Sequence, residues 1–310
     1  MKLLFVVNPI SGDNDKKGFL DSLEGFAYRY IFEYDLFLTT GNHDKKQLNR
    51  LVNREKPDIV VAVGGDGTVL LVAEVVMHTN IRLGIIPYGS ANGMAAELNI
   101  PNHKEEALKV LLQGKSVAID NLKINQTHNC IHIGDIGFNA RMVKRFETDR
   151  MRGFKGYAKQ FFKEFSLSKK IKVDIQTEKK RYTKSAHMIA FANARRYGTK
   201  ALLNPIGKLD DGYFELCILK DLSVRVLFLI LLSWFTGSMY KTRFAEIIRC
   251  KKARIQLHKN KRMTVQVDGE VIGDKNTISI DVEPSCLHVM VPKEPSGKFL
   301  DLLVAEVEYE

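Results

Sequence analysis

The residues best suited to chemistry form one glycine-dense turn, Gly64-Gly65-Asp66-Gly67-Thr68. The apolar run 58–63 precedes this turn, and the apolar run 69–76 follows it. We therefore predict a buried parallel strand, then the turn, then a helix with Thr68 as its N-cap. Glycines let backbone N–H groups approach an anion closely, and a helix N-terminus favours negative charge. The turn is thus predicted to hold a phosphate group.

Asp66 narrows the chemistry that this turn predicts. A carboxylate beside a phosphate repels it unless a cation or a shared proton lies between the two groups. The combination favours phosphoryl transfer over passive binding of a dinucleotide.

Two further turns follow predicted strands in the same part of the chain. Asn8-Pro9-Ile10-Ser11-Gly12 comes directly after Leu3–Val7, and residues 87–93 come after Arg82–Ile86. Within the second turn, Ser90 could cap the short helix predicted at Met94–Leu98 or could bind a phosphate. Because parallel strands end at one edge of their sheet, all three turns are expected to converge there.

The elements that must position these turns alternate between strand and helix over residues 1–121. This alternation predicts an α/β N-terminal domain with a doubly wound parallel sheet. The expected strands are Leu3–Val7, Tyr34–Leu38, Asp58–Val63 and Arg82–Ile86, and the expected helices include Lys16–Arg29 and His43–Glu55.

Residues 122–291 have a different texture, with short β-rich runs separated by turn signals. They predict a C-terminal all-β, sandwich-like domain of antiparallel strands. Helical inserts are expected at Phe154–Phe165 and Leu222–Phe235, and the tail 292–310 is expected to join the first domain. The β-rich runs are Leu122–Asn125, Cys130–Ile136, Ile171–Gln176, Ala186–Ala192, Tyr213–Leu219, Ala253–His258, Met263–Val267, Thr277–Val282 and Leu287–Val291.

Two turns of the second domain carry two acidic residues each. Asp210-Asp211-Gly212 is either a solvated turn or a site for a hard cation, since Mg²⁺ prefers carboxylate and carbonyl oxygens. Asp268-Gly269-Glu270 is either an ordinary hairpin turn or the source of a general base, Glu270, if it faces a nucleotide. The residue types alone leave both alternatives open.

The charge of the chain predicts an anionic partner. Lys and Arg number 47 against 36 Asp and Glu, which gives a net charge of +11. Basic and aromatic residues are interleaved in 144–172, and 249–262 holds basic residues and no acidic one. Such segments suit an anionic membrane or single-stranded nucleic acid. No recognised nucleic-acid sequence motif is present, so we favour the membrane surface and expect no nucleic-acid partner.

Cysteine spacing and hydropathy indicate the compartment. Cys130, Cys217, Cys250 and Cys286 are widely scattered, which predicts neither a zinc site nor a disulfide framework and fits a reducing cytoplasm. The strongest membrane candidate, Val226–Phe235, falls well short of the ~20 residues that span a bilayer. We therefore expect a cytoplasmic protein, peripheral at the inner membrane face, with no transmembrane segment; the sequence leaves the oligomeric state open.

Taken together, these motifs resemble the diacylglycerol kinase catalytic-domain family, the bacterial lipid kinases related to sphingosine kinases. Residues 8–12 look like its N-P-x-S-G loop, residues 64–68 match its G-G-D-G-T motif, and residues 87–92 look like its P-x-G-[TS]-x-N motif. Residues 209–213 and 267–270 match its two C-terminal signatures. The resemblance therefore runs over nearly the whole chain, although G-G-D-G-T alone also occurs in NAD kinases and resembles phosphofructokinases.

The resemblance implies a kinase that transfers the γ-phosphoryl group of ATP to a hydroxyl of a membrane lipid such as diacylglycerol. It implies an N-terminal domain like that of NAD kinases and phosphofructokinases, with the nucleotide between this domain and the β-sandwich. The implied ATP-binding residues are Asn8, Pro9, Ile10, Ser11, Gly12, Thr39, Gly64, Gly65, Asp66, Gly67, Thr68 and Ser90.

The resemblance also implies roles for acidic residues of both domains. Glu270 takes the position of the proton acceptor, and Asp66, Asp120 and Asp268 match acidic positions of a charge network. The implied Mg²⁺ ligands are Asp211 through its side chain, and Lys208 and Tyr213 through backbone oxygens. Whether Glu270 or Asp268 is the base stays open.

The chain departs from the family pattern at two places, and two other functions remain as alternatives. Leu70-Leu71 stand where the family usually has a polar Asn-Glu pair, and Gly93 stands where it often has Asp. Both changes weaken polar contacts to the nucleotide or to Mg²⁺. The alternatives are a soluble NAD kinase and a non-catalytic module that binds lipid or nucleotide, and the sequence does not name the lipid.

Overall fold

A computed structural model describes residues 1–10, 16–137, 140, 169–197, 201–221 and 245–293. The chain divides into two compact units, residues 1–119 with those from 286 onward, and residues 120–285. The helical inserts expected at Phe154–Phe165 and Leu222–Phe235 lie outside the described residues, as does the tail from residue 294. No helix of the described residues is both long enough and apolar enough to cross a membrane.

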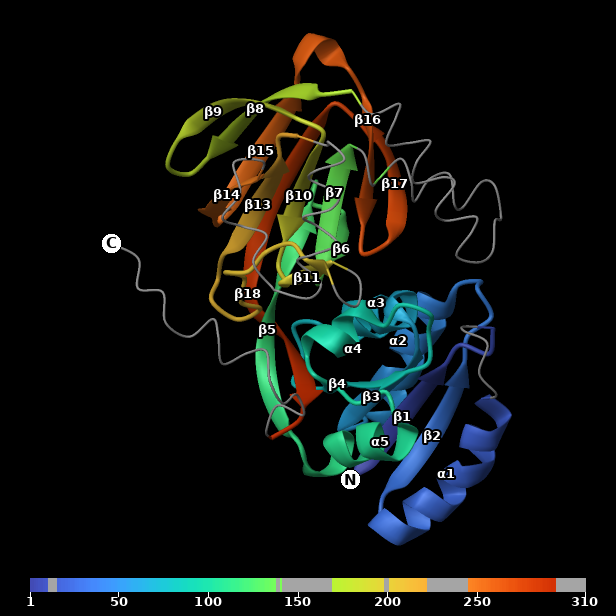
Figure 1. The fold of residues 1–310 in the computed structure, drawn as a ribbon. Helices are drawn as coiled ribbons and strands as arrows, with labels where there is room; N and C mark the ends of the chain where they lie inside the picture. The colour runs from blue at the N-terminus through green and yellow to red at the C-terminus, as the bar shows by residue number, and fades with distance from the viewer. Residues whose placement is uncertain (11–15, 138–139, 141–168, 198–200, 222–244, 294–310) are drawn as a thin grey trace, which may run out of the picture. The chain divides into compact units, whose positions relative to one another are not determined.

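The first unit is built on a parallel sheet with strand order β2-β1-β3-β4 (Figure 1). Its strands are β1 (Lys2–Val7), β2 (Glu33–Leu38), β3 (Ile59–Gly64) and β4 (Arg82–Pro87). Every residue of β3 is buried, whereas β2, at the edge, has none fully buried. This gradient explains why the central strands are continuous apolar runs, as expected where helices cover both faces of a sheet.

Among the described residues of this unit, five helices follow or connect the strands. They are α1 (Lys16–Tyr30), α2 (Asp44–Glu55), α3 (Asp66–Val76), α4 (Gly93–Glu97) and α5 (Lys104–Gln113). The α2 helix shows the expected amphipathic pattern, because Leu48 and Val52 are buried in an otherwise polar sequence. The alternation of strands and helices confirms the predicted α/β class.

The second unit is a sandwich of two sheets around one apolar core. One sheet is wholly antiparallel, with strand order β14-β13-β10-β7-β16-β17. The other contains β15, β8 and β9 beside β18, with β5 and β6. Side chains of both sheets, such as Phe191 and Phe214 from the first and Val173 and Ile255 from the second, share the core. This arrangement confirms the predicted sandwich.

The strands of the second unit include several that the sequence pattern did not reveal. The expected runs correspond to β6 (His128–Cys130), β7 (Ile133–Gly137), β8 (Ile171–Thr177), β10 (Met188–Ala192), β13 (Phe214–Leu219), β15 (Lys252–Leu257) and β16 (Met263–Val267). The additional strands are β9 (Arg181–Ala186), β11 (Arg196–Tyr197), β12 (Ala201–Leu202), β14 (Ala245–Cys250) and β17 (Glu270–Lys275); a short 3₁₀ helix covers His258–Asn260. Strands β9, β14 and β17 lie at sheet edges, and each carries charged residues that hide the apolar pattern.

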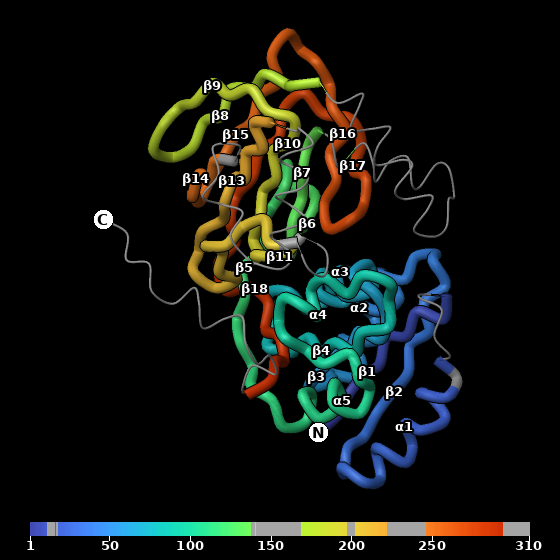
Figure 2. The backbone as a smooth tube through the Cα atoms, in the orientation of Figure 1, coloured from blue at the N-terminus to red at the C-terminus, as the bar shows by residue number. Residues whose placement is uncertain are grey.

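Two long strands carry the chain from one unit to the other. Strand β5 (Lys115–Ile124) leaves the first unit, and β18 (Thr277–Val291) returns to it, as the chain path in Figure 2 shows. The separate strands expected at Thr277–Val282 and Leu287–Val291 are therefore one strand, which continues through Pro284. Its first half pairs with β15, and Val289 pairs in parallel with Leu83 of β4.

Candidate active site

The carboxyl edge of the parallel sheet gathers the predicted nucleotide-binding turns. The register pairs Val7 with both Leu38 and Val63, and Gly64 with Pro87. The residues that follow these strands are therefore neighbours along one edge. Three backbone hydrogen bonds join the residues just beyond the strand ends. Thr39 N donates to Val7 O at 2.9 Å, Asn8 N to Val63 O at 3.2 Å, and Tyr88 N to Gly64 O at 2.8 Å.

Two glycines of the Gly64–Thr68 turn are required by close packing. A Cβ at Gly64 would overlap the side chain of Thr68, which is only 5% exposed. A Cβ at Gly65 would lie 3.2 Å from the Cα of Gly89, and one at Gly89 would overlap the Cα of Gly65. Two backbone segments thus touch where no side chain fits.

The helix after this turn begins earlier than the sequence indicated. Gly65, with extended backbone, is the N-cap of α3, and the N–H groups of Thr68 and Val69 donate to its carbonyl oxygen at 3.0 and 3.1 Å. The prediction of Thr68 as N-cap is therefore wrong. Its buried side chain packs over Gly64 in the first helical turn instead.

The Asp66 carboxylate is held by backbone N–H groups of another turn. Gly93 N donates to Oδ2 and Met94 N to Oδ1, both at 3.0 Å. These are the first two residues of α4, so the carboxylate caps that helix and meets the positive end of its dipole. Asp66 therefore ties the Gly64–Thr68 turn to the turn that contains Ser90. The two N–H donors also offset part of the negative charge by which the Asp66 carboxylate would repel a phosphate.

The turn after β4 is closed by its own asparagine. Asn92 has a left-handed backbone with φ 53°, and its side chain accepts from Gly89 N and donates to Gly89 O, both at 2.8 Å. Asn92 is the N-cap of α4, and Ser90 is exposed. Of the two roles considered for Ser90, the exposed hydroxyl is available for a ligand.

Of the loop after β1, the structure describes only Asn8, Pro9 and Ile10; Ser11 and Gly12 lie outside the described residues. The Asn8 side chain accepts from Ile10 N at 3.1 Å, which bends the chain directly after the strand. Helix α1 begins at Lys16, a residue that the sequence motifs do not single out. Lys16 is only 6% exposed, and burial lowers the pKa of its ammonium group. The sequence signal for Lys16 is its position at the start of the helix that follows β1.

In the second unit, Asp268 and Gly269 form a two-residue hairpin turn between β16 and β17, and Glu270 directly follows it. Asp268 and Gly269 have φ values of 48° and 89°, as a type I′ turn requires, and Val267 pairs with Glu270. The two acidic side chains then part. Glu270 is exposed, whereas Asp268 points to the loop that precedes β7.

Asp268 holds that loop through four donors. Its Oδ2 accepts from Ile131 N at 2.9 Å, and its Oδ1 accepts from His132 N at 3.1 Å, Ile133 N at 3.0 Å and the Cys130 thiol at 3.3 Å. Burial raises the pKa of Asp268 despite these bonds. The carboxylate is therefore occupied by structural bonds on both oxygens.

The turn around Asp210-Asp211-Gly212 is also tied to a buried carboxylate. Asp120 is fully buried and accepts from Gly212 N and from Ser285 N, both at 2.7 Å. Burial raises the pKa of Asp120, and the neighbouring charges of Asp211 and Asp210 raise it further. Asp120 thus orders this turn within the second unit.

Two matches with known families cover most of the chain. The diacylglycerol kinase catalytic domain matches residues 2–124, and the YegS C-terminal NAD kinase beta sandwich-like domain matches residues 134–291. The chain belongs to the diacylglycerol kinase catalytic-domain family.

Relatives named as probable lipid kinases match most of the sequence. A Pectobacterium atrosepticum protein named "Probable lipid kinase YegS-like" is 29% identical over 299 residues, which cover 94% of this chain and 97% of the relative. A Yersinia enterocolitica protein of the same name is 27% identical over 242 residues, 76% of this chain and 79% of its own. The crystal structure of a Bacillus anthracis diacylglycerol kinase aligns with a TM-score of 0.71 at 17% identity, over 94% of this chain and 96% of its own, and supports the fold.

The resemblance to this family places Mg²⁺ on Asp211, Lys208 and Tyr213, and the bonds of Asp211 bear on that assignment. Tyr213 N donates to Asp211 Oδ1 at 3.0 Å, and the Arg249 guanidinium donates to Oδ2 at 2.6 Å. Mg²⁺ demands oxygen ligands at about 2.0–2.1 Å in an octahedral shell. The Arg249 guanidinium places a positive charge beside Asp211 Oδ2, and that charge repels a metal ion at the same oxygen.

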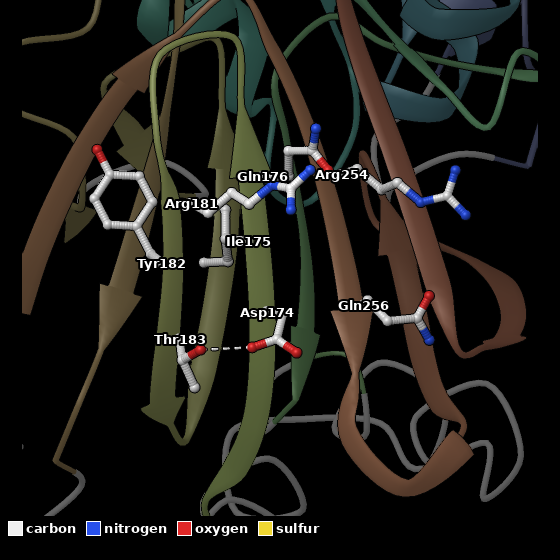
Figure 3. Close-up of a pocket in the computed structure, with 8 residues that line it drawn as sticks. All are labelled: Asp174, Ile175, Gln176, Arg181, Tyr182, Thr183, Arg254 and Gln256. Atoms are coloured by element: carbon white, nitrogen blue, oxygen red, sulfur yellow. Dashed lines mark hydrogen bonds between the residues drawn. The ribbon is translucent and has the colours of Figure 1, made fainter.

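One shallow pocket lies apart from the predicted residues of the second unit. It has a volume of about 400 Å³ and is lined by eight residues of β8, β9 and β15, among them Asp174, Arg181, Tyr182 and Arg254 (Figure 3). Thr183 donates to Asp174 at 2.6 Å across its floor. None of the predicted site residues lines it, so this pocket is not part of the candidate active site.

Proposed function

We propose that this chain is an ATP-dependent lipid kinase, which transfers the γ-phosphoryl group of ATP to a hydroxyl of a membrane lipid such as diacylglycerol. The observation that carries the proposal is the alignment of Asn8, Thr39 and Gly64 along one sheet edge, in a member of this lipid-kinase family. Ligands of open parallel sheets bind outside the carboxyl ends of the strands.

In this proposal the ATP phosphates lie over Gly65–Thr68. Phosphoryl transfer requires positioning and charge neutralisation more than covalent help from the protein. The glycine packing brings backbone N–H groups to the phosphates, and Asn8–Gly12, Thr39 and Ser90 complete the nucleotide site. Mg²⁺ accompanies the phosphates of the nucleotide and supplies charge neutralisation there.

Glu270 is the proposed proton acceptor. A lipid hydroxyl has a pKa far above neutrality, so its proton must leave as the new bond to phosphorus forms. Glu270 is exposed at the tip of its hairpin and thus accessible to a substrate, whereas both Asp268 oxygens accept structural bonds. Asp268 therefore positions the hairpin, and Glu270 carries the proton.

The proposed substrate lies in a membrane, and the proposed location is the cytoplasmic face of the inner membrane. The net charge of +11 supports attraction to anionic lipid. Peripheral binding brings the enzyme to its substrate without a transmembrane segment.

The test is transfer of radiolabel from γ-labelled ATP to total lipid extract, to purified diacylglycerol or phosphatidylglycerol in anionic vesicles, and to NAD. We expect label in a lipid fraction, and none in the same fraction with Glu270→Gln. Label in NAD with none in lipid would establish the NAD-kinase alternative instead. Label in neither acceptor, for wild-type protein shown to bind ATP, would favour a non-catalytic module.

A further inference from the structure

Four carboxylates lie in or next to the turn at residues 208–213, whose only basic residue, Lys208, is exposed. Asp210 and Asp211 lie in the turn itself, and Asp120 lies beneath it. The next strand adds Glu215, whose side chain is 2% exposed. Asn204 donates to Glu215 at 2.6 Å, but an amide carries no charge. Asp120 and Glu215 are buried, Asp211 is partly buried and Asp210 is exposed. A nearby cation stabilises carboxylates that are withdrawn from water in this way.

Arg249 reaches two of these carboxylates at once. Its guanidinium lies 2.6 Å from Asp211 Oδ2 through one nitrogen and 3.5 Å from Glu215 Oε1 through another. The flat face of the guanidinium also lies over the Tyr213 ring, 4.2 Å from its centroid. A planar fork with several donors suits this position, where a carboxylate pair and an aromatic ring meet. The Lys251 ammonium lies over the same ring, 4.8 Å from its centroid, but of these two cations only Arg249 bonds both carboxylates.

The sheet register fixes this position. Strand β14 pairs with β13 so that Arg249 stands directly opposite Glu215. Asp211 lies four residues before Glu215, in the turn that leads into β13. The arginine is therefore placed by backbone hydrogen bonds of the antiparallel sheet and not by a mobile loop.

We propose that Arg249 is the resident cation of this turn and takes the place of a structural Mg²⁺ ion. The guanidinium occupies Asp211 Oδ2, and Tyr213 N occupies Oδ1. A magnesium ion within about 2.1 Å of the same oxygen would stand next to a second positive charge, which repels it. The turn thus keeps its shape without metal, and Mg²⁺ enters the enzyme only with the nucleotide.

Thermal unfolding without nucleotide or lipid tests this assignment. We expect the unfolding midpoint of the wild type to be the same in EDTA and in millimolar MgCl₂. Arg249→Gln removes the cation, so its midpoint should fall by several degrees in EDTA and recover in MgCl₂. Arg254→Gln is the matched control: this arginine is also exposed, lies on β15 in the pocket of Figure 3, and should show neither effect.

Two results would overturn the proposal. One is a wild-type midpoint that rises with MgCl₂ in the absence of nucleotide. The other is Arg249→Gln protein whose midpoint does not respond to MgCl₂. If that variant does not fold, Arg249→Lys decides, because a lysine keeps the charge but loses the fork. We then expect a midpoint below that of the wild type, the same in EDTA and in MgCl₂, and a midpoint that rises with MgCl₂ would count against the assignment. Neither readout requires catalysis, so this proposal and the kinase proposal fail independently.

Discussion

The two units each contain a glycine turn with a carboxylate, and they fix that turn in different ways. In the first unit, Gly64–Thr68 depends on backbone contact, since Gly65 and Gly89 touch where no Cβ fits. In the second unit, nothing lies within 4 Å of the Cβ position of Gly269, and the carboxylate of Asp268 holds the turn. One turn is built by the absence of side chains and the other by a single side chain.

This difference suits the two turns to different tasks, phosphate binding in one and proton transfer in the other. A turn packed from glycines presents backbone N–H groups and has no side chain to spare for proton transfer. In the hairpin held by Asp268, Glu270 is exposed at the start of β17, where a substrate can reach it. In the proposed function the first turn binds phosphate and the second supplies the proton acceptor, and each prediction below tests one side of this division.

The largest effect is expected from Glu270→Gln. Loss of a general base costs typically 10²–10⁴-fold in rate, so lipid phosphorylation should fall by about that factor. The side chain is exposed, so the unfolding midpoint should stay at the wild-type value. Glu33→Gln, at an exposed glutamate of β2, is the control and should keep full activity. Lipid phosphorylation by Glu270→Gln at the wild-type rate would remove the assignment.

Gly89→Ala tests the backbone contact of the first unit. The new Cβ would meet the Cα of Gly65, which is backbone and cannot rotate away. Overpacking of this kind costs about 1–3 kcal/mol, and ATP affinity should fall because the phosphate turn must shift. Urea unfolding and nucleotide titration measure the two effects.

Gly25→Ala is the matched control for Gly89→Ala. Gly25 lies within α1, with nothing within 4 Å of its Cβ position. Alanine there should stabilise the protein by about 0.5–1 kcal/mol, since glycine is the poorer helix former. Equal ATP affinity in Gly89→Ala and Gly25→Ala would contradict the role of the contact.

Asp268→Asn tests the single side chain that holds the second turn. An amide replaces one acceptor oxygen with a donor that faces backbone N–H groups, and such an unsatisfied arrangement costs about 1–3 kcal/mol. Burial raises the folded-state pKa of Asp268, so the stability from its protonated form is complete below the unfolded pKa of about 3.9 and is lost as pH rises. The cost of the substitution should therefore be larger near pH 4 than near pH 7. Urea unfolding at both pH values measures it, and a cost that grows with pH would contradict the cause given.

Most of the fold could be predicted from the sequence because its signals are local. The apolar run of β3 and the turn after it are contiguous in the chain, and their strand–turn–helix order follows from them. The start of α3 could not be predicted, because Thr68 is a good N-cap by type and only its packing over Gly64 moves the cap to Gly65. Strand β9 was missed because its charges lie at an edge that only the sheet order reveals.

The candidate site was predictable as a set of motifs but not as a set of bonds. The sequence placed Asp66 beside phosphate, yet its partners, Gly93 N and Met94 N, are 27 and 28 residues away. Likewise Arg249 is 38 residues from Asp211 and reaches it only through the pairing of β13 with β14. Contacts between residues so far apart in the sequence depend on tertiary structure, and no local sequence pattern predicts them.

The smallest expected effect is a change in cysteine reactivity, which shows how far the loss of the Asp268 hydrogen bonds extends. All four cysteines are buried, and burial raises the thiol pKa of Cys130 and of Cys217. The thiolate is the reactive form, so native protein at pH 8 should react slowly with a thiol reagent. In Asp268→Asn, Cys130 should react faster, because the negative charge that raises its pKa is gone and its loop has lost an acceptor. Cys217, whose pKa is raised by burial and by Glu215, should keep its wild-type rate.

Mass spectrometry of labelled peptides distinguishes labelling at Cys130 from labelling at Cys217. Faster labelling at both would mean that the whole unit loosens and that Asp268 does not act on this hairpin alone.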